Sequence, residues 1–205
     1  MNATGLRHPL TTEFLELVAG RRGHFRLESG HHSGLWLDLD ALFADPRRIE
    51  PFVASLTNAL RAYDVAAVCG PLLGGAFLAQ LVARGLPAEF CFTEREPPPV
   101  SDEFYRARYR VPSAFSARIR GKRLAIVDDV MSAGSALRGT WAALEEQGAE
   151  PVVAGALLVL GSTGADFFAG QAVPVEAVAR DSYDLWRPSD CPLCAAGVPL
   201  ENPAG

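Results

Sequence analysis

The chain has 205 residues, of which 49% are hydrophobic and 21% charged, and its formal net charge is −5. This composition predicts a folded domain rather than a disordered chain, and the acidic balance argues against nucleic acid as a main partner. Without an apolar run of membrane-spanning length or a signal-peptide pattern, and with only four cysteines, the chain is expected to be cytoplasmic, with no membrane partner and no disulfide framework.

The N-terminal part predicts a helix followed by a hairpin. Thr11 or Thr12 can cap the helix, and the segment 21–23 ends it. Two arms of alternating apolar residues then flank a Gly/Ser-rich turn, which indicates a hairpin ahead of the main domain. His31 and His32 lie on that turn, where a ligand or catalytic role is the less favoured interpretation.

The next segments predict an α/β core. Pro46 opens a helix that reaches about Tyr63. The strand 65–69, a glycine-bearing loop at 70–75, a helix and the strand 88–92 follow in that order. This βαβ pattern implies a right-handed crossover and a parallel sheet.

The segment 93–123 interrupts the pattern. Three consecutive prolines, at 97–99, exclude a central strand or a helix interior there. Aromatic residues and arginines partly alternate over 104–111, which favours a solvent-facing hairpin. A long irregular insertion of this kind is typical of a functional lid or of disorder.

The chain closes with strands expected at 152–160 and near 173–178, followed by a Pro/Cys-rich tail. Cys191 and Cys194 have the spacing of half a zinc site. No second pair is recognised elsewhere in the sequence. A simple turn in the tail is therefore the favoured interpretation, ahead of a redox role or a zinc site shared across a dimer.

The stretch 124–136 carries the strongest functional signal. Four apolar residues predict a strand buried on both faces, and Asp128 and Asp129 follow where it should end. Small and hydroxylated residues then lead into a helix. Backbone N–H groups at such a helix N-terminus bind phosphate, while two carboxylates can accept hydrogen bonds from ribose hydroxyls. The alternative is an ordinary strand-to-helix turn with an acidic edge.

This stretch closely resembles the motif with which type I phosphoribosyltransferases bind 5-phosphoribosyl 1-pyrophosphate (PRPP). The resemblance sharpens to the orotate phosphoribosyltransferases and covers nearly the whole chain. Three further segments carry it: Phe25 with Ser29-Gly30 and Ser33, Gly70-Pro71 after the first core strand, and Cys91 to Arg95.

The resemblance implies a single α/β domain of type I phosphoribosyltransferase fold, spanning 1–205. Its mostly parallel sheet of four to six strands is flanked by helices. An N-terminal hood lies mainly at 20–42, the core at about 43–180, and the tail at 181–205. The implied reaction transfers 5-phosphoribose from PRPP to a nucleobase and releases pyrophosphate, with orotate as the first acceptor to consider. Mg²⁺ is the implied cofactor, held mainly by PRPP, and a homodimer is the implied assembly.

The resemblance also assigns residues. Asp128, Asp129 and Arg95 are the expected catalytic residues, and the two aspartates could also contact Mg²⁺. Weak base-binding roles fall to Phe25 and Trp36. The residues expected to bind PRPP are Val130, Met131, Ser132, Ala133, Gly134, Ser135 and Ala136 around the 5′-phosphate, Leu72, Leu73, Gly74 and Gly75 at the pyrophosphate, and Arg106 and Arg108 of the insertion.

Three positions depart from the family pattern. Glu28 and Gly74 stand where the family usually has lysine, and Ser162 falls near the position of an arginine that binds the orotate carboxylate. The acceptor therefore stays open at this point. The alternatives are transfer to a purine base and a non-catalytic regulator that binds PRPP or a nucleotide.

Overall fold

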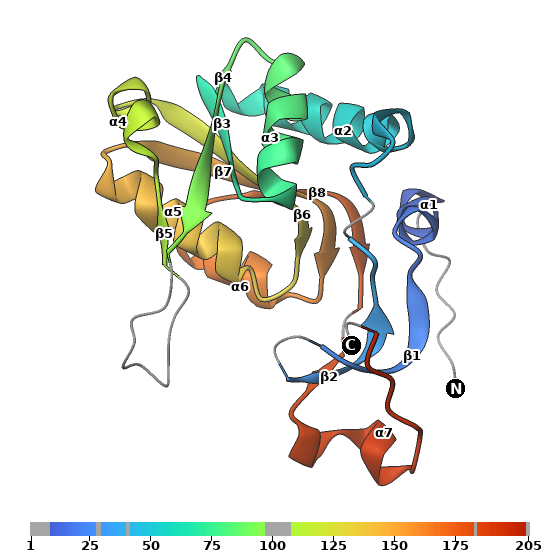
Figure 1. Cartoon of the computed structure of the whole chain (residues 1–205). Helices are drawn as coiled ribbons and strands as arrows, with labels where there is room; N and C mark the ends of the chain where they lie inside the picture. The colour runs from blue at the N-terminus through green and yellow to red at the C-terminus, as the bar shows by residue number, and fades with distance from the viewer. Residues whose placement is uncertain (1–8, 28–29, 40–41, 97–107, 183, 204–205) are drawn as a thin grey trace.

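The computed structural model describes residues 9–27, 30–39, 42–96, 108–182 and 184–203 (Figure 1). The helices of this part are α1 (Pro9–Leu17), α2 (Pro46–Leu60), α3 (Gly74–Arg84), α4 (Ser113–Ile119), α5 (Ser135–Glu146), α6 (Thr163–Gly170) and α7 (Pro192–Ala195), with the 3₁₀ turns η1 (Arg61–Tyr63) and η2 (Pro188–Asp190). The strands are β1 (Arg21–Arg26), β2 (His32–Trp36), β3 (Ala67–Pro71), β4 (Glu89–Arg95), β5 (Tyr109–Arg110), β6 (Arg123–Met131), β7 (Glu150–Leu160), β8 (Val175–Asp181) and β9 (Leu185–Trp186). None of the helices described is long and apolar enough to cross a membrane.

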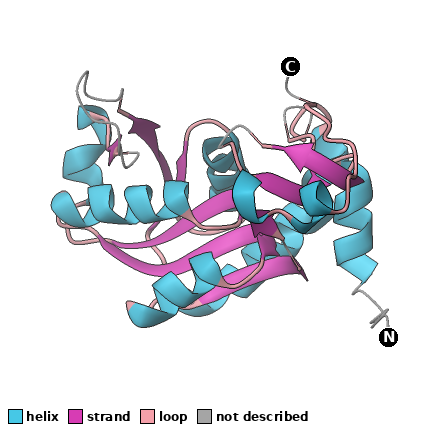
Figure 2. Cartoon of the chain, turned by 90° about the horizontal axis from the view of Figure 1, so that it is seen from below, coloured by secondary structure: helices cyan, strands magenta, loops and turns pink. Residues whose placement is uncertain are grey.

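Six strands form the main sheet in the order β5-β4-β3-β6-β7-β8. Neighbours from β4 to β8 are parallel, and only the short edge strand β5 runs antiparallel, against β4. Helices lie on both faces of this sheet (Figure 2). The mostly parallel α/β sheet predicted from the sequence is thus confirmed.

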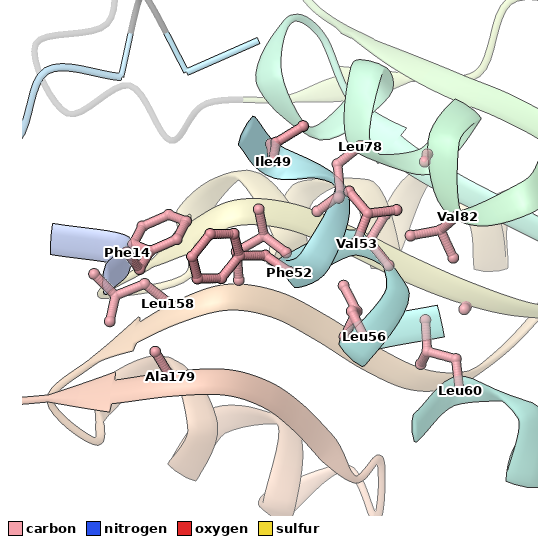
Figure 3. Packing of buried hydrophobic residues seen from close by; sticks show 14 of the residues in the cluster. Phe14, Ile49, Phe52, Val53, Leu56, Leu60, Leu78, Val82, Leu158 and Ala179 are labelled. Carbon is pink, nitrogen blue, oxygen red and sulfur yellow. The ribbon is translucent and has the colours of Figure 1, made fainter. Parts of the chain in front are cut away.

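The core consists of two hydrophobic clusters, one on each face of the sheet. Along β6, Val127 belongs to the cluster that contains residues of α1, α2 and α3, whereas Ile126 belongs to the cluster with residues of α5 and α6. Because successive side chains of a strand point to opposite faces, both must be apolar here. Figure 3 shows part of the first cluster, where the rings of Phe14 and Phe52 meet edge to face with centroids 5.5 Å apart.

The helix predicted from Pro46 to about Tyr63 is confirmed as α2 followed by η1. Asp45 caps it, because its carboxylate accepts a hydrogen bond from Arg47 N at 3.1 Å and Pro46 occupies the first turn. The cap expected at Thr11 or Thr12 for the first helix is wrong, since α1 already begins at Pro9. Thr11 is instead buried, and its hydroxyl donates to the carbonyl oxygen of Arg180 in β8 at 3.5 Å.

The predicted N-terminal hairpin is confirmed as the antiparallel pair β1 and β2, with an irregularity between Arg22 and Phe25. The C-terminal tail adds to it, because β9 pairs with β2 to give a three-stranded sheet. Further along the tail, the backbone of Glu201 forms two hydrogen bonds with β1. Arg26 N donates to the Glu201 carbonyl oxygen at 2.9 Å, and Glu201 N donates to the backbone carbonyl oxygen of His24 at 2.8 Å. Figure 1 shows this C-terminal segment beside the hood strands.

The insertion has regular structure where it is described. β5 pairs with the end of β4, so that Arg95 lies opposite Tyr109, and α4 follows. The first half of the predicted aromatic and arginine hairpin, and with it Arg106, lies outside the described residues. The lid interpretation of the insertion therefore stays a prediction.

Candidate active site

Asp128 and Asp129 lie in the last part of β6, beside β7, where Asp128 pairs with Ala156. The strand was expected to end before them, but it continues to Met131. Both residues are half-buried. Each carboxylate accepts a hydrogen bond from the next backbone N–H, Asp128 from Asp129 N at 3.1 Å and Asp129 from Val130 N at 2.7 Å. These bonds hold the two side chains at the strand's end.

The surroundings of this pair disfavour ionisation of both carboxyl groups at once. Burial raises the pKa of the Asp128 carboxyl well above its usual value, and the neighbouring charge of Asp129 raises it further. Burial also raises the pKa of Asp129, although the hydrogen bond from Val130 partly offsets this. A pair of carboxylates in this condition is stabilised by a ligand that supplies hydroxyl donors or a cation.

The turn from β6 into α5 has the shape expected of an anion site. Gly134 adopts φ 72°, a left-handed conformation, and directly precedes the helix. No described side chain caps α5, so its first backbone N–H groups are available to a ligand. The start of α6 supports the turn, because Gly164 N donates to the carbonyl oxygen of Ser132 at 3.1 Å.

The second glycine loop lies directly against the two carboxylates. A Cβ atom built on Gly74 would lie 2.1 Å from Oδ2 of Asp129, and one built on Gly75 would lie 2.8 Å from Oδ1 of Asp128. The two predicted phosphate loops are therefore brought together by β3 and β6, which are neighbours in the sheet. Helix α3 begins at Gly74 and, like α5, has no cap from a described side chain. The Leu72–Leu73 peptide bond of this loop is cis.

Three described arginines, Arg95, Arg108 and Arg110, lie at the neighbouring strand ends. Arg95 is exposed at the end of β4, whose register places Thr93 opposite Pro71 of β3. Arg108 is also exposed and precedes β5, while Arg110 forms an ion pair with Glu94. The carboxyl ends of β3, β4 and β6 share one edge of the sheet because these strands are parallel.

The two aromatic residues expected near the base differ in accessibility. Phe25 has no exposed surface, whereas Trp36 is half-buried. The guanidinium of Arg21 lies 5.3 Å from the ring centroid of Phe25 and 6.0 Å from that of Trp36. Of these two residues, Trp36 alone is accessible to a ligand. Glu28 and Ser29 of the hood turn lie outside the described residues.

The structure also assembles a group of residues that the sequence did not connect. The ligand atoms of His24, His32, Cys191 and Cys194 all lie within 4.8 Å of one another. The simple tail turn expected around the cysteines is therefore an incomplete description, and His24 was missed altogether. The only available signal was that a hairpin register could bring His24 and His32, eight positions apart, to the same end of the hood.

Comparison with known proteins agrees with this geometry. A family model of the phosphoribosyl transferase domain matches residues 48–167. The curated orotate phosphoribosyltransferase of Thermotoga petrophila is 34% identical over 88% of this chain and 89% of its own. That of Carboxydothermus hydrogenoformans is 32% identical over 93% of both chains.

Solved structures share the fold. The orotate phosphoribosyltransferase from Aeropyrum pernix has a TM-score of 0.63 at 22% identity and covers 83% of this chain and 93% of its own. An adenine phosphoribosyltransferase from Trypanosoma brucei also has a TM-score of 0.63, at 16% identity, covering 84% of this chain and 79% of its own. The curated relatives, which are far more similar in sequence, select between these two kinds of neighbour: this chain belongs to the orotate phosphoribosyltransferase family.

Proposed function

We propose that this protein transfers the 5-phosphoribosyl group of PRPP to orotate, giving orotidine 5′-monophosphate and pyrophosphate. The observation that carries the proposal is the contact between the α3 N-terminus and the carboxylates of Asp128 and Asp129. It brings two helix N-termini and an acidic pair to one edge of the sheet. That set matches the chemistry of PRPP, which has a phosphate, a pyrophosphate and two ribose hydroxyls between them.

The phosphates would bind at the two helix starts. The backbone N–H groups of Ser135 and Ala136 face the 5′-phosphate in this assignment, with the small side chains of 132–134 leaving room for it. The loop from Leu72 to Gly75 would hold the pyrophosphate in the same manner. At both sites the helix start has no side-chain cap among the described residues, and the helix dipole favours an anion there. The N–H of Leu72 already donates to the carbonyl oxygen of Thr93 at 2.9 Å, so the pyrophosphate would be held by the N–H groups that follow it.

The acidic pair would bind the ribose between the phosphates. Ionised carboxylates accept hydrogen bonds from the two ribose hydroxyls, which replaces the water lost on burial. The pair also fits Mg²⁺, whose preferred ligands are oxygens and which keeps most of its water when one or two carboxylates bind it. When bound with PRPP, Mg²⁺ supplies positive charge next to the departing pyrophosphate.

The protein's contribution to the chemistry would be orientation and charge stabilisation. Pyrophosphate leaves the anomeric carbon as a nitrogen of the base attacks from the opposite face, and positive charge develops on the sugar ring. Asp128 and Asp129, held by the backbone at the strand end, would stabilise that charge through the ring hydroxyls. Arg95 and Arg108 would pair with the leaving pyrophosphate, as would Arg106 of the insertion.

Orotate is supported as acceptor by the curated relatives rather than by a recognised pocket. The resemblance places the family's carboxylate-binding arginine near position 162, where this chain has Ser162, directly before α6. A purine acceptor is the alternative to test, since adenine phosphoribosyltransferases share the fold. Family membership also supports a cytoplasmic location and a homodimer. Sedimentation of the purified protein would test the homodimer.

A pyrophosphate-release assay with PRPP, Mg²⁺ and a panel of bases separates the alternatives. We expect release to depend on orotate and to exceed that with adenine, guanine or hypoxanthine. Faster release with a purine would make the protein a purine phosphoribosyltransferase. Binding of PRPP without release on any base would instead indicate a regulator.

A further inference from the structure

Four potential metal ligands converge where the tail meets the hood. His24 and His32 come from the paired strands β1 and β2, and Cys191 and Cys194 flank the start of α7. His24, His32 and Cys191 are 1%, 5% and 3% exposed, and Cys194 is exposed. All four cysteines of the chain are free thiols in the structure. None of these residues belongs to the phosphoribosyl site described above.

Four of the six distances among the ligand atoms are close to those of a tetrahedron around one metal ion, and all six are within 4.8 Å. Nε2 of His24 lies 3.2 Å from Nδ1 of His32, 3.4 Å from Sγ of Cys191 and 3.7 Å from Sγ of Cys194. Sγ of Cys194 lies 3.3 Å from Nδ1 of His32. Tetrahedral Zn²⁺ with ordinary bond lengths separates its ligands by ~3.3 Å for two nitrogens and ~3.6 Å for nitrogen and sulfur.

The hydrogen bond of the His24 ring also favours a metal ion over a cluster of hydrogen bonds. Nδ1 of His24 lies 2.8 Å from the carbonyl oxygen of Val198. A carbonyl can only accept, so Nδ1 carries a proton, and in the neutral ring Nε2 then presents a lone pair. One lone pair can accept a single hydrogen bond, yet three polar atoms surround it. A cation at their centre uses the lone pairs of all four residues at once.

The contact between His24 and Val198 is the support that metal-binding histidines usually have. A backbone carbonyl that accepts from the second ring nitrogen fixes both the tautomer and the orientation of the ring. Two thiolates and two neutral imidazoles also balance the charge of a divalent zinc ion, so a mostly buried site would hold no net charge. Sulfur and imidazole ligands together select zinc over Mg²⁺.

We propose that His24, His32, Cys191 and Cys194 bind one structural Zn²⁺ that fastens the C-terminal segment to the hood. Four protein ligands leave no open coordination position, which is the pattern of structural rather than catalytic zinc. The ion joins elements more than 160 residues apart in sequence. It therefore acts where β9 and Glu201 also attach the tail to the hood strands.

Metal content of the purified protein is the first test. The protein is produced without a polyhistidine tag and its metals are measured by inductively coupled plasma mass spectrometry. We expect about one zinc per chain. A preparation with no metal, in which peptide mapping finds Cys191 and Cys194 joined as a disulfide, would overturn the proposal. Stoichiometric iron or copper in place of zinc would overturn the choice of metal.

Matched variants then assign the ligands. Cys194→Ser and His32→Asn are expected to lose most of the bound zinc. His31→Asn, next to His32 but outside the cluster, and Cys91→Ala, a buried cysteine of the core, are expected to keep it. Asp128→Asn is expected to keep it as well, which distinguishes this site from the carboxylate pair. Full zinc occupancy in both ligand variants would contradict the assignment.

Three measurements on the unaltered protein do not depend on the folding of variants. Replacement of zinc by Co²⁺ should give the visible absorption bands of a tetrahedral site with thiolate ligands. Cys194, although exposed, should resist alkylation in the zinc-loaded protein and become reactive after chelation. Chelation should also lower the thermal midpoint in the absence of PRPP, because binding energy at such a site is folding energy. Equal alkylation of Cys194 with and without chelator would show that no metal binds there.

Discussion

Gly74 and Asp129 are in contact across the two loops of the candidate site: a Cβ atom on Gly74 would lie 2.1 Å from Oδ2 of Asp129. Any side chain at position 74 must therefore displace that carboxylate. A lysine, which the family resemblance leads us to expect at this position, would meet the same obstacle here. Asp129 and the α3 N-terminus form a single unit, so a change in one alters the other.

Gly74→Ala should weaken PRPP binding because the added methyl group moves the Asp129 carboxylate from its place. The expected loss is about 10- to 100-fold, the range for one hydrogen bond to a charged group. Calorimetric titration with PRPP and Mg²⁺ measures it. Gly170→Ala is the matched control, since a Cβ atom there meets no atom within 4 Å. Unchanged affinity in Gly74→Ala would show that Asp129 does not contact the sugar.

Asp128→Asn should make the ligand-free protein more stable at neutral pH while it weakens PRPP binding. The folded-state pKa of Asp128 is raised above its ordinary value of 3.8, because burial and Asp129 oppose its charge. Stability from this group is thus fully present below about pH 3.8 and is lost as pH rises through the raised pKa. Thermal unfolding without divalent cations should show an advantage for the variant that grows with pH. An advantage that is constant with pH would contradict this origin.

Glu89→Gln should change stability with the opposite pH dependence. Glu89 forms ion pairs with Lys122 and Arg118, each at 3.0 Å, and these bonds lower its pKa below the ordinary 4.5. Its contribution to stability is present above pH 4.5 and is lost as pH falls through the lowered pKa. We expect Glu89→Gln to be slightly less stable than the parent at neutral pH and equally stable in acid. A variant more stable than the parent at pH 7 would show that Glu89 destabilises the folded protein and would contradict this prediction.

Tyr63→Phe should destabilise the protein at neutral pH. The phenol of Tyr63 donates a hydrogen bond to the Glu176 carboxylate of β8, and this bond, with burial, raises its pKa to about 12. The stabilisation is present below the ordinary pKa of 10.0 and is lost as pH rises through about 12. Ultraviolet titration should therefore find one late-ionising tyrosine that is missing in the variant. Glu176→Gln keeps an acceptor and should shift that ionisation to lower pH.

Local patterns were sufficient to predict the core and the proximity of the two glycine-bearing loops. Ile126 and Val127 face opposite clusters, as a run of apolar residues without polar alternation predicts for a strand covered on both sides. The meeting of the glycine loop with Asp128 follows from parallel strands that end at one edge of the sheet. The residue roles themselves stay predictions until PRPP binding is measured.

Features that depend on distant contacts could not be predicted in the same way. The first helix includes Thr11 rather than beginning after it, and the Thr11 hydroxyl donates to Arg180 of β8, a contact 169 positions away. Likewise, Cys191 contacts His24 from 167 positions away. The hydrophobic pattern of neither segment indicates that contact. Ser162 marks a further limit. The resemblance predicts an orotate-binding arginine near this position, and the sequence does not indicate which residue replaces it.

Direct product analysis is the most decisive measurement. The protein and its Asp128→Asn/Asp129→Asn variant are incubated with PRPP, Mg²⁺ and orotate, and both products are quantified by chromatography. We predict that the parent forms orotidine 5′-monophosphate and pyrophosphate in equal amounts, and that the folded variant loses about 100-fold or more in rate because the developing charge is no longer stabilised. A parent that forms no orotidine 5′-monophosphate, or a variant as active as the parent, would contradict the proposed function or its site.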